Sequence, residues 1–171
     1  LKSSGVNSTT PQLYNSHNSK TAFVFPGQGS QYVGMGKEVW DRFQIAKDTF
    51  KEAGDVLKKD IAKLCFEGPE SELNLTENTQ PAILTASIAI WRAMGTDLSP
   101  SYLAGHSLGE YTALVVSGAL AFKDAVHMVN LRGRFMQEAV PEGIGAMAAI
   151  LGLKGDIVKD ICKEASDDNF V

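Results

Sequence analysis

Apolar runs and helical patterns alternate along this chain. Residues 21–25 (TAFVF) are short, apolar and rich in β-favouring side chains, and the Pro-Gly pair behind them ends the run, which predicts a buried strand. Residues 101–104 (SYLA) predict a second buried strand. Residues 146–151 are a third strand candidate.

Helical periodicity fills the segments between these runs. The expected helices cover residues 37–53, 55–65, 81–94, 108–116, 123–140 and 156–165. Residues 81–94 are apolar on nearly all sides, which is typical of a buried helix. We expect Pro81 to open that helix, because the first turn does not need the N–H that proline lacks. Strands that alternate with helices in this way predict an α/β fold with a mostly parallel sheet flanked by helices.

Three segments differ in composition. Residues 1–20 are rich in Ser, Thr and Asn, contain no Asp or Glu and show no hydrophobic periodicity. They predict a vector-derived tail or a disordered end, with the remnant of an organelle transit peptide as the alternative. Residues 21–143 hold the alternation of strands and helices, and the glycines near 143–145 predict a boundary to a smaller subdomain over 144–171.

Composition and charge exclude several classes of protein. The chain has 171 residues, of which 44% are hydrophobic and 21% are charged, as in ordinary globular domains. Its net charge of −4 argues against nucleic-acid binding, and no apolar run approaches the length of a membrane span. Cys65 and Cys162 have no paired spacing, so we expect neither a disulfide nor a metal site. We expect a reducing, cytoplasmic location, or a plastid or other organelle if residues 1–20 are a transit remnant.

Residues 105–109 (GHSLG) have the form G-x-S-x-G between the second predicted strand and the helix after it. A sharp turn of this kind lifts the hydroxyl of the central serine, Ser107, clear of the backbone, and the flanking glycines let the strand and the helix approach closely. Free N–H groups at the start of the helix are suited to stabilise an oxyanion. Ser107 is therefore a candidate nucleophile, and the alternative is a packed turn with a serine that only caps the helix.

A glycine-rich loop, residues 26–36 (PGQGSQYVGMG), follows the first predicted strand. Its glycines are spaced too widely for the dinucleotide-binding fingerprint, and no Walker lysine follows, so a phosphate cradle is the weaker interpretation. A loop that presents main-chain N–H groups to an oxyanion fits the spacing better.

Two arginines in the predicted helix over 123–140 differ in their surroundings. Arg132 falls on the apolar stripe of this helix, and Arg134 falls on its polar side. The stripe consists of Ala125, Met128, Val129, Phe135, Met136 and Ala139, and the polar side includes Lys123, His127, Asn130 and Glu138. A guanidinium that faces the interior needs an anion or carbonyl groups. Arg132 therefore either takes part in an internal ion pair or binds the free carboxylate of a substrate through two parallel hydrogen bonds.

None of the three histidines is well placed to activate Ser107. His17 lies in the predicted tail, and His127 lies on the polar side of its helix. His106 precedes the serine in a tight turn, so we expect its side chain to point away from the hydroxyl and to have a structural or site-lining role.

Four motifs occur in order along the chain: PGQGSQYVGMG, TQPA, GHSLGE and LRGRFMQEAVPEGIGAMAAI. Together they resemble the malonyl-CoA:acyl carrier protein transacylases of fatty-acid synthesis, from about residue 20 to about residue 165. The pair of GHSLGE with PGQGSQ is far more specific than G-x-S-x-G alone. The resemblance implies an acyltransferase with an α/β-hydrolase-like large subdomain, followed by the start of a small ferredoxin-like subdomain.

The resemblance also implies roles for six positions. Ser107 is implied as the nucleophile, and Arg132 as the residue that binds the substrate carboxylate. The main-chain N–H groups of Gln28 and Leu108 are implied as the oxyanion hole. Two further residues are implied to line the site, namely His106 and Gln80.

The implied reaction moves a malonyl group from malonyl-CoA to the phosphopantetheine thiol of acyl carrier protein through a malonyl-serine intermediate. No bound cofactor is expected, since coenzyme A and phosphopantetheine are parts of the substrates. The family's catalytic base is a histidine in the second half of its chain, so we expect this chain to need that half as a partner. The alternatives are the acyltransferase domain of a polyketide synthase, a serine thioesterase or esterase, and a non-catalytic fragment that binds carrier protein.

Overall fold

The computed structural model describes residues 20–95, 99–140 and 150–166. The chain divides into two compact units, Leu1–Glu138 and Ala139–Val171. None of the described helices is long and apolar enough to cross a membrane.

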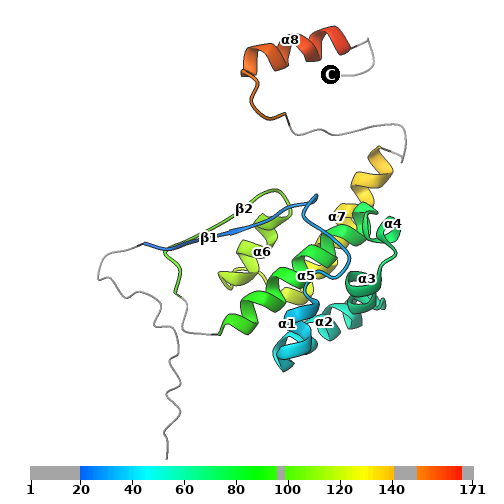
Figure 1. The fold of residues 1–171 in the computed structure, drawn as a ribbon, viewed down its shortest axis with the longest axis vertical. Helices are drawn as coiled ribbons and strands as arrows, with labels where there is room; N and C mark the ends of the chain where they lie inside the picture. The colour runs from blue at the N-terminus through cyan, green and yellow to red at the C-terminus, as the bar shows by residue number, and fades with distance from the viewer. Residues whose placement is uncertain (1–19, 96–98, 141–149, 167–171) are drawn as a thin grey trace, which may run out of the picture. The chain divides into compact units, whose positions relative to one another are not determined.

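Two short strands make up the described part of the sheet (Figure 1). Strand β1, Ala22–Phe25, runs parallel to strand β2, Tyr102–Gly105, and Phe23 lies opposite Leu103 in the register. Helices separate the two strands along the chain, as a parallel connection requires. The predicted α/β class with a parallel sheet is therefore confirmed.

The prediction that both strands are buried is wrong for the described residues. Val24 is 73% exposed in β1, and Tyr102 is 55% exposed in β2. The residues that alternate with them, such as Phe25, are more buried, because helix α6, Gly109–Val116, packs against both strands. A parallel strand is buried only when helices cover both faces of its sheet, and one face is uncovered in this part of the chain.

The helix boundaries differ in places from the expected ones. The described helices are α1 Lys37–Arg42, α2 Gln44–Leu57, α3 Ile61–Glu67, α4 Glu70–Leu73, α5 Thr76–Met94, α6 Gly109–Val116, α7 Phe122–Ala139 and α8 Gly155–Ala165. The pattern over residues 37–53 predicted one helix, but the extended backbone of Phe43 (φ −126°, ψ 125°) separates α1 from α2. Helix α2 continues through Gly54 to Leu57, and Lys58, which has a left-handed backbone (φ 54°), caps it.

Helix α5 forms the centre of the core, as its apolar sequence predicted. Its fully buried side chains include Leu84 and Ile88. It packs against α2 and α6, and Figure 1 shows it between α6 and the pair α1 and α2. A helix that is covered on several sides needs apolar residues around its whole circumference, which explains the pattern.

Pro81 lies inside α5, which corrects the expectation that it opens the helix. The helix begins at Thr76, ahead of the proline. The first turn is anchored by Thr79, whose hydroxyl donates a hydrogen bond to the Leu73 carbonyl oxygen (2.6 Å). This contact with the preceding short helix stabilises a turn that the apolar pattern alone does not reveal.

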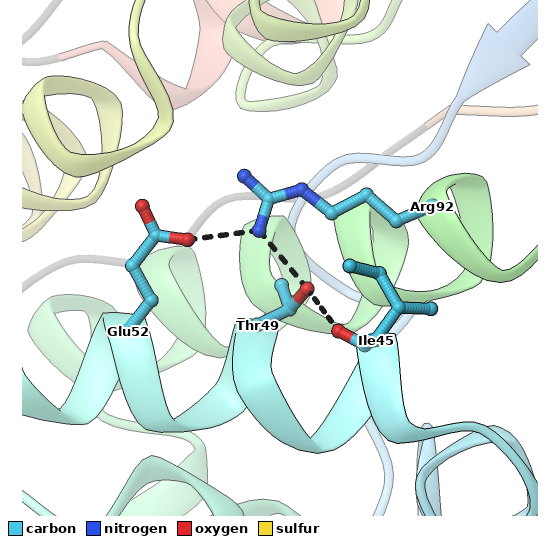
Figure 2. A network of polar contacts seen from close by, with 4 residues as sticks. All are labelled: Ile45, Thr49, Glu52 and Arg92. Atoms are coloured by element: carbon cyan, nitrogen blue, oxygen red, sulfur yellow. Dashed lines mark hydrogen bonds and ion pairs between the residues drawn. The ribbon is translucent and has the colours of Figure 1, made fainter. Parts of the chain in front are cut away.

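A polar cluster joins α5 to α2 (Figure 2). Arg92 Nη1 donates to Glu52 Oε2 (2.8 Å) and to Thr49 Oγ1 (3.0 Å). The Thr49 hydroxyl in turn donates to the Ile45 carbonyl oxygen (2.7 Å). The side chains of Arg92 and Glu52 are 29% and 26% exposed, so water screens this ion pair less than a fully exposed pair. The cluster therefore stabilises the packing of the two helices.

The second unit contains α8. This helix, Gly155–Ala165, confirms the prediction of a helix over 156–165. Ile150 and Leu151 do not lie in a strand, and the remainder of the strand candidate 146–151 lies outside the described residues. The boundary near 143–144 lies outside them as well, so the small ferredoxin-like subdomain stays a prediction.

Candidate active site

Ser107 lies at the turn between β2 and α6, as the G-x-S-x-G pattern predicted. Its backbone is left-handed (φ 53°), a conformation that serine seldom adopts and that persists where the surroundings enforce it. The next residue, Leu108, is fully buried and anchors the turn, whereas Ser107 is exposed. Helix α6 has no side-chain cap, so the alternative of a serine that only caps the helix is not what the structure has.

The two flanking glycines permit the close approach that this turn requires. A Cβ atom on Gly105 would collide with the backbone of Gly109, and a Cβ atom on Gly109 would collide with the backbone of Phe25. Main-chain atoms cannot rotate out of the way as a side chain can. Both glycines are therefore required by the packing of the turn against β1.

The Ser107 hydroxyl accepts a hydrogen bond from Arg132. Nη2 of Arg132 lies 3.0 Å from Ser107 Oγ, and Nη1 donates to Gln80 Oε1 at 2.7 Å. The ring of Tyr111 lies 5.9 Å from the guanidinium carbon, within the range of a cation–π contact. The guanidinium thus joins α5, α6 and the turn between β2 and α6 at one point.

Arg132 is half-buried, and no described carboxylate forms an ion pair with it. The internal ion pair that the sequence left open is therefore absent from the described part of the chain. Arg134 is exposed, as its place on the polar side of the helix predicted. Of the two arginines, only Arg132 lies where it can reach a group bound to Ser107.

The predicted apolar stripe of α7 is only partly correct. Phe135 is 61% exposed and Met128 is 44% exposed. The buried face of the helix consists of Phe122, Ala125, Val126, Val129 and Gly133. The face turned to the core is therefore rotated from the expected one, because small residues and the close contact at Gly133 decide how α7 packs.

Gln80 has fixed contacts at both ends of its amide. The side chain is fully buried; Oε1 accepts from Arg132, and Nε2 donates to the Met136 sulfur at 3.3 Å. Met136 belongs to the predicted apolar stripe, which gives no indication of this contact. Its position four residues after Arg132, on the same side of the helix, was the available signal.

The glycine-rich loop lies against the turn that carries the serine. A Cβ atom on Gly27 would lie 2.8 Å from Nδ1 of His106, so the histidine ring packs beside the loop. Gln28 Nε2 donates to Thr76 Oγ1 (3.2 Å), which attaches the loop to the start of α5. Within the described residues, no main-chain acceptor pairs with the N–H groups of Gln28 and Leu108, and the oxyanion hole itself stays a prediction.

Among the described residues, no other candidate side chain forms a hydrogen bond with the serine hydroxyl. Neither His106 nor His127 forms a hydrogen bond with Ser107 Oγ among the described contacts, and both are exposed. Burial raises the pKa of the Cys65 thiol to about 12, so this cysteine stays protonated and is not an alternative nucleophile.

Comparison with known proteins agrees with this arrangement. The model of the Acyl transferase domain family matches residues 22–171. The malonyl CoA-acyl carrier protein transacylase of Bacillus subtilis (strain 168) is 52% identical over 151 residues, which cover 88% of this chain and 48% of that protein. The Escherichia coli K12 protein of the same name is 52% identical over 153 residues, covering 88% of this chain and 49% of that one. The chain therefore spans about half the length of the curated relatives it matches.

Solved structures match as well. The transacylase of the same name from Coxiella burnetii has a TM-score of 0.80 at 50% identity and covers 85% of this chain and 47% of that one. A malonyl-transacylase solved in complex with a type II polyketide synthase acyl-carrier protein has a TM-score of 0.80 at 53% identity, with 85% and 48% covered. The resemblance stated from the motifs is confirmed, and the segment that the family model matches includes Gln80, Ser107 and Arg132. This chain belongs to the acyl transferase domain family.

Proposed function

We propose that this chain carries the nucleophile and the substrate-binding arginine of an enzyme that moves malonyl groups from malonyl-CoA to acyl carrier protein in fatty-acid synthesis. The observation that carries the proposal is the contact between Arg132 Nη2 and Ser107 Oγ, 3.0 Å apart. The names of relatives at 52% identity support it.

The transfer proceeds in two steps at Ser107. First, Oγ forms a bond to the thioester carbonyl carbon of malonyl-CoA, the carbon–sulfur bond breaks, and coenzyme A leaves as a thiol with the proton that the serine loses. Next, the phosphopantetheine thiol of the carrier protein attacks the same carbon, the ester bond breaks, and the serine hydroxyl regains a proton. Coenzyme A and phosphopantetheine enter as parts of the substrates, so neither step uses a bound cofactor.

Arg132 binds the free carboxylate of the malonyl group. A single methylene separates that carboxylate from the carbonyl carbon that Ser107 attacks, so a guanidinium in contact with Oγ is also close to the carboxylate. Gln80 Oε1 accepts from Nη1 and holds the guanidinium in place, while Nη2 can exchange the serine for the substrate. An acetyl group has no carboxylate and gains no charge-assisted hydrogen bond from this arginine.

The main chain and a second segment complete the proposed reaction. The N–H groups of Gln28 and Leu108 donate to the oxyanion of each tetrahedral intermediate. The proton of Ser107 passes to a histidine in the half of the relatives' length that this chain does not span, since neither His106 nor His127 contacts the serine hydroxyl among the described residues. His106 lines the site beside the glycine-rich loop.

Two kinds of carrier protein are candidates. One solved relative is a malonyl-transacylase in complex with a type II polyketide synthase acyl-carrier protein, so a polyketide carrier is the second candidate beside that of fatty-acid synthesis. Hydrolysis by water is the less favoured reaction, because esters of neutral acids make no use of Arg132. A cytoplasmic location stays a prediction, in line with the free thiols of Cys65 and Cys162.

The test is a malonylation assay on a fused protein, defined as residues 1–171 joined to the C-terminal half of the Bacillus subtilis relative. We expect peptide mass spectrometry to locate a malonyl group on Ser107 after exposure to malonyl-CoA, and Ser107→Ala to abolish both this label and the transfer. Ser101→Ala is the control, since Ser101 is also exposed but lies before β2. Malonyl-carrier protein as the product indicates a transferase, and free malonate indicates a hydrolase. A malonyl group on another residue would contradict the assignment of the nucleophile.

A further inference from the structure

Helix α5 contains a carbonyl group that its own backbone cannot satisfy. Pro81 has no N–H, so the hydrogen bond that a helix would form to the carbonyl of Glu77, four residues earlier, is missing. An unpaired carbonyl in a buried helix is costly. Asn130 of α7 supplies the missing donor, because its Nδ2 atom lies 2.9 Å from the Glu77 carbonyl oxygen.

Helix α7 approaches the backbone of α5 closely at this same turn. A Cβ atom on Gly133 would lie 2.6 Å from Glu77 Cα and 2.6 Å from the Thr76 carbonyl oxygen. Gly133 follows Asn130 by one helical turn and directly follows Arg132. The amide of Asn130 therefore bonds the two helix backbones on one side of the arginine. On the other side, the absence of a side chain at Gly133 lets the backbones approach closely.

The same pair of helices carries the side chains of the site. Gln80, directly before Pro81, accepts a hydrogen bond from Arg132 at 2.7 Å. The bond from Asn130 to Glu77 lies one turn earlier on α5. A change in the distance between the two helices at Glu77 would therefore also move Gln80 relative to Arg132.

We propose that Asn130 is a positioning residue for malonyl selectivity: its amide binds the Glu77 carbonyl that Pro81 leaves free, and so holds Arg132 between Gln80 and Ser107. The helical pattern predicts Asn130 on the polar side of its helix, but the residue is half-buried and its amide donates to the backbone of α5. This inference rests on the proposed function, since it concerns the carboxylate-binding role of Arg132.

The Glu77 carbonyl can receive a hydrogen bond from a donor other than Asn130. In Pro81→Ala, residue 81 regains an N–H that can donate to the Glu77 carbonyl within α5. A variant that loses Asn130 but has this N–H keeps the carbonyl paired. The effect of Asn130→Ala should therefore depend on whether residue 81 is proline.

The experiment measures malonyl and acetyl transfer by the fused protein and by its variants Asn130→Ala, Pro81→Ala and the double variant. We expect Asn130→Ala to lower the ratio of malonyl to acetyl transfer about three- to tenfold, in the range of one neutral hydrogen bond. The double variant should recover most of the ratio. His127→Ala, an exposed change on the same helix, is the control and should leave the ratio unchanged.

Several outcomes would overturn the inference. An unchanged ratio in Asn130→Ala, even with a lower unfolding temperature, would mean a merely structural role. A ratio of malonyl to acetyl transfer as low in the double variant as in Asn130→Ala would mean that the Glu77 carbonyl does not connect Asn130 to the position of Arg132. The proposed function fails separately, if the unmodified fused protein transfers no malonyl. In that case thermal unfolding still tests the contact itself, and additive effects of the two substitutions on the unfolding temperature would refute the link between Asn130 and the Glu77 carbonyl.

Discussion

At the scale of single residues, Ser107 combines an exposed side chain with an uncommon left-handed backbone conformation that its neighbours keep in place. Its left-handed φ of 53° is held between the fully buried Leu108 and a strand end that tolerates only glycine at position 105. Arg132 Nη2 donates a hydrogen bond to this hydroxyl. For the proposed nucleophile, a turn that already presents the hydroxyl lowers the entropic part of the barrier.

Arg132→Ala in the fused protein should weaken malonyl transfer and relatively spare acetyl transfer. A hydrogen bond to a charged group contributes on the order of 1.5–3 kcal/mol, and about 1.4 kcal/mol corresponds to a tenfold change in rate. The ratio of malonyl to acetyl transfer should therefore fall roughly 10- to 150-fold. Steady-state kinetics with the two thioesters measures it.

Arg134→Ala is the matched control for this prediction. Arg134 has the same charge, lies on the same helix and is exposed. Loss of an exposed arginine should change the ratio by less than about twofold. Similar kinetics for the two variants would remove the basis for assigning the carboxylate site to Arg132.

At the scale of secondary-structure elements, α5 links the core to the site. Near its start it carries Gln80, which holds the Arg132 guanidinium. Near its end it carries Arg92, which is bonded to Glu52 and Thr49 of α2 (Figure 2). The helix is thus fixed at both ends, and its packing against α2 contributes to the position of Gln80.

Arg92→Ala should lower the free energy of unfolding by about 1–2 kcal/mol, because it leaves the carboxylate of Glu52 partly buried without its partner. Chemical denaturation of the fused protein measures this change. Arg42→Ala is the control: the side chains of its pair with Glu38 are 67% and 85% exposed, and such pairs contribute less than about 1 kcal/mol. Equal losses of stability in both variants would contradict the role of burial at Arg92.

At the scale of the whole molecule, the described residues leave the sheet open. Val24 and Tyr102 lie on one face of the two strands and are 73% and 55% exposed. Exposed apolar strands favour association with other chains. The chain also spans about half the length of the relatives it matches. Both facts lead to predictions about the chain by itself.

Residues 1–171 by themselves should transfer malonyl groups roughly 10²–10⁴-fold more slowly than the fused protein, because among the described residues neither His106 nor His127 forms a hydrogen bond with Ser107. They should also aggregate more readily. A carrier-protein malonylation assay with light scattering, on the chain with and without the C-terminal half, measures both properties. Full turnover by residues 1–171 would assign the role of the base to a histidine within them, with His106 the first to test.

Residues 1–19 should be removable without loss of the fold. Their sequence shows no hydrophobic periodicity and therefore offers little apolar surface to bury. Lys20 is kept, because its Nζ donates to the Tyr102 hydroxyl at 3.2 Å. The unfolding temperature of the fused protein with and without this segment measures the effect. A fall of several degrees would mean that the segment packs against the rest of the chain.

The sequence by itself determined the local features of this protein. The order of strand, turn and helix around Ser107, the buried character of α5 and the glycines of the turn all follow from patterns within a few residues. The motifs were specific enough to identify the family. Local patterns suffice here because hydrogen bonding, glycine conformations and helical periodicity act between neighbours in the chain.

The tertiary structure alone decided which side chains meet. Gln80, Arg132 and Met136 come together because α5 and α7 pack closely at Gly133, and no periodicity within either helix determines that contact. The pairing of Asn130 with the Glu77 carbonyl likewise needs Pro81 in one helix and a donor in the other. Such contacts depend on how distant surfaces fit when both helices are packed, and that fit is a property of the assembled core rather than of any one segment.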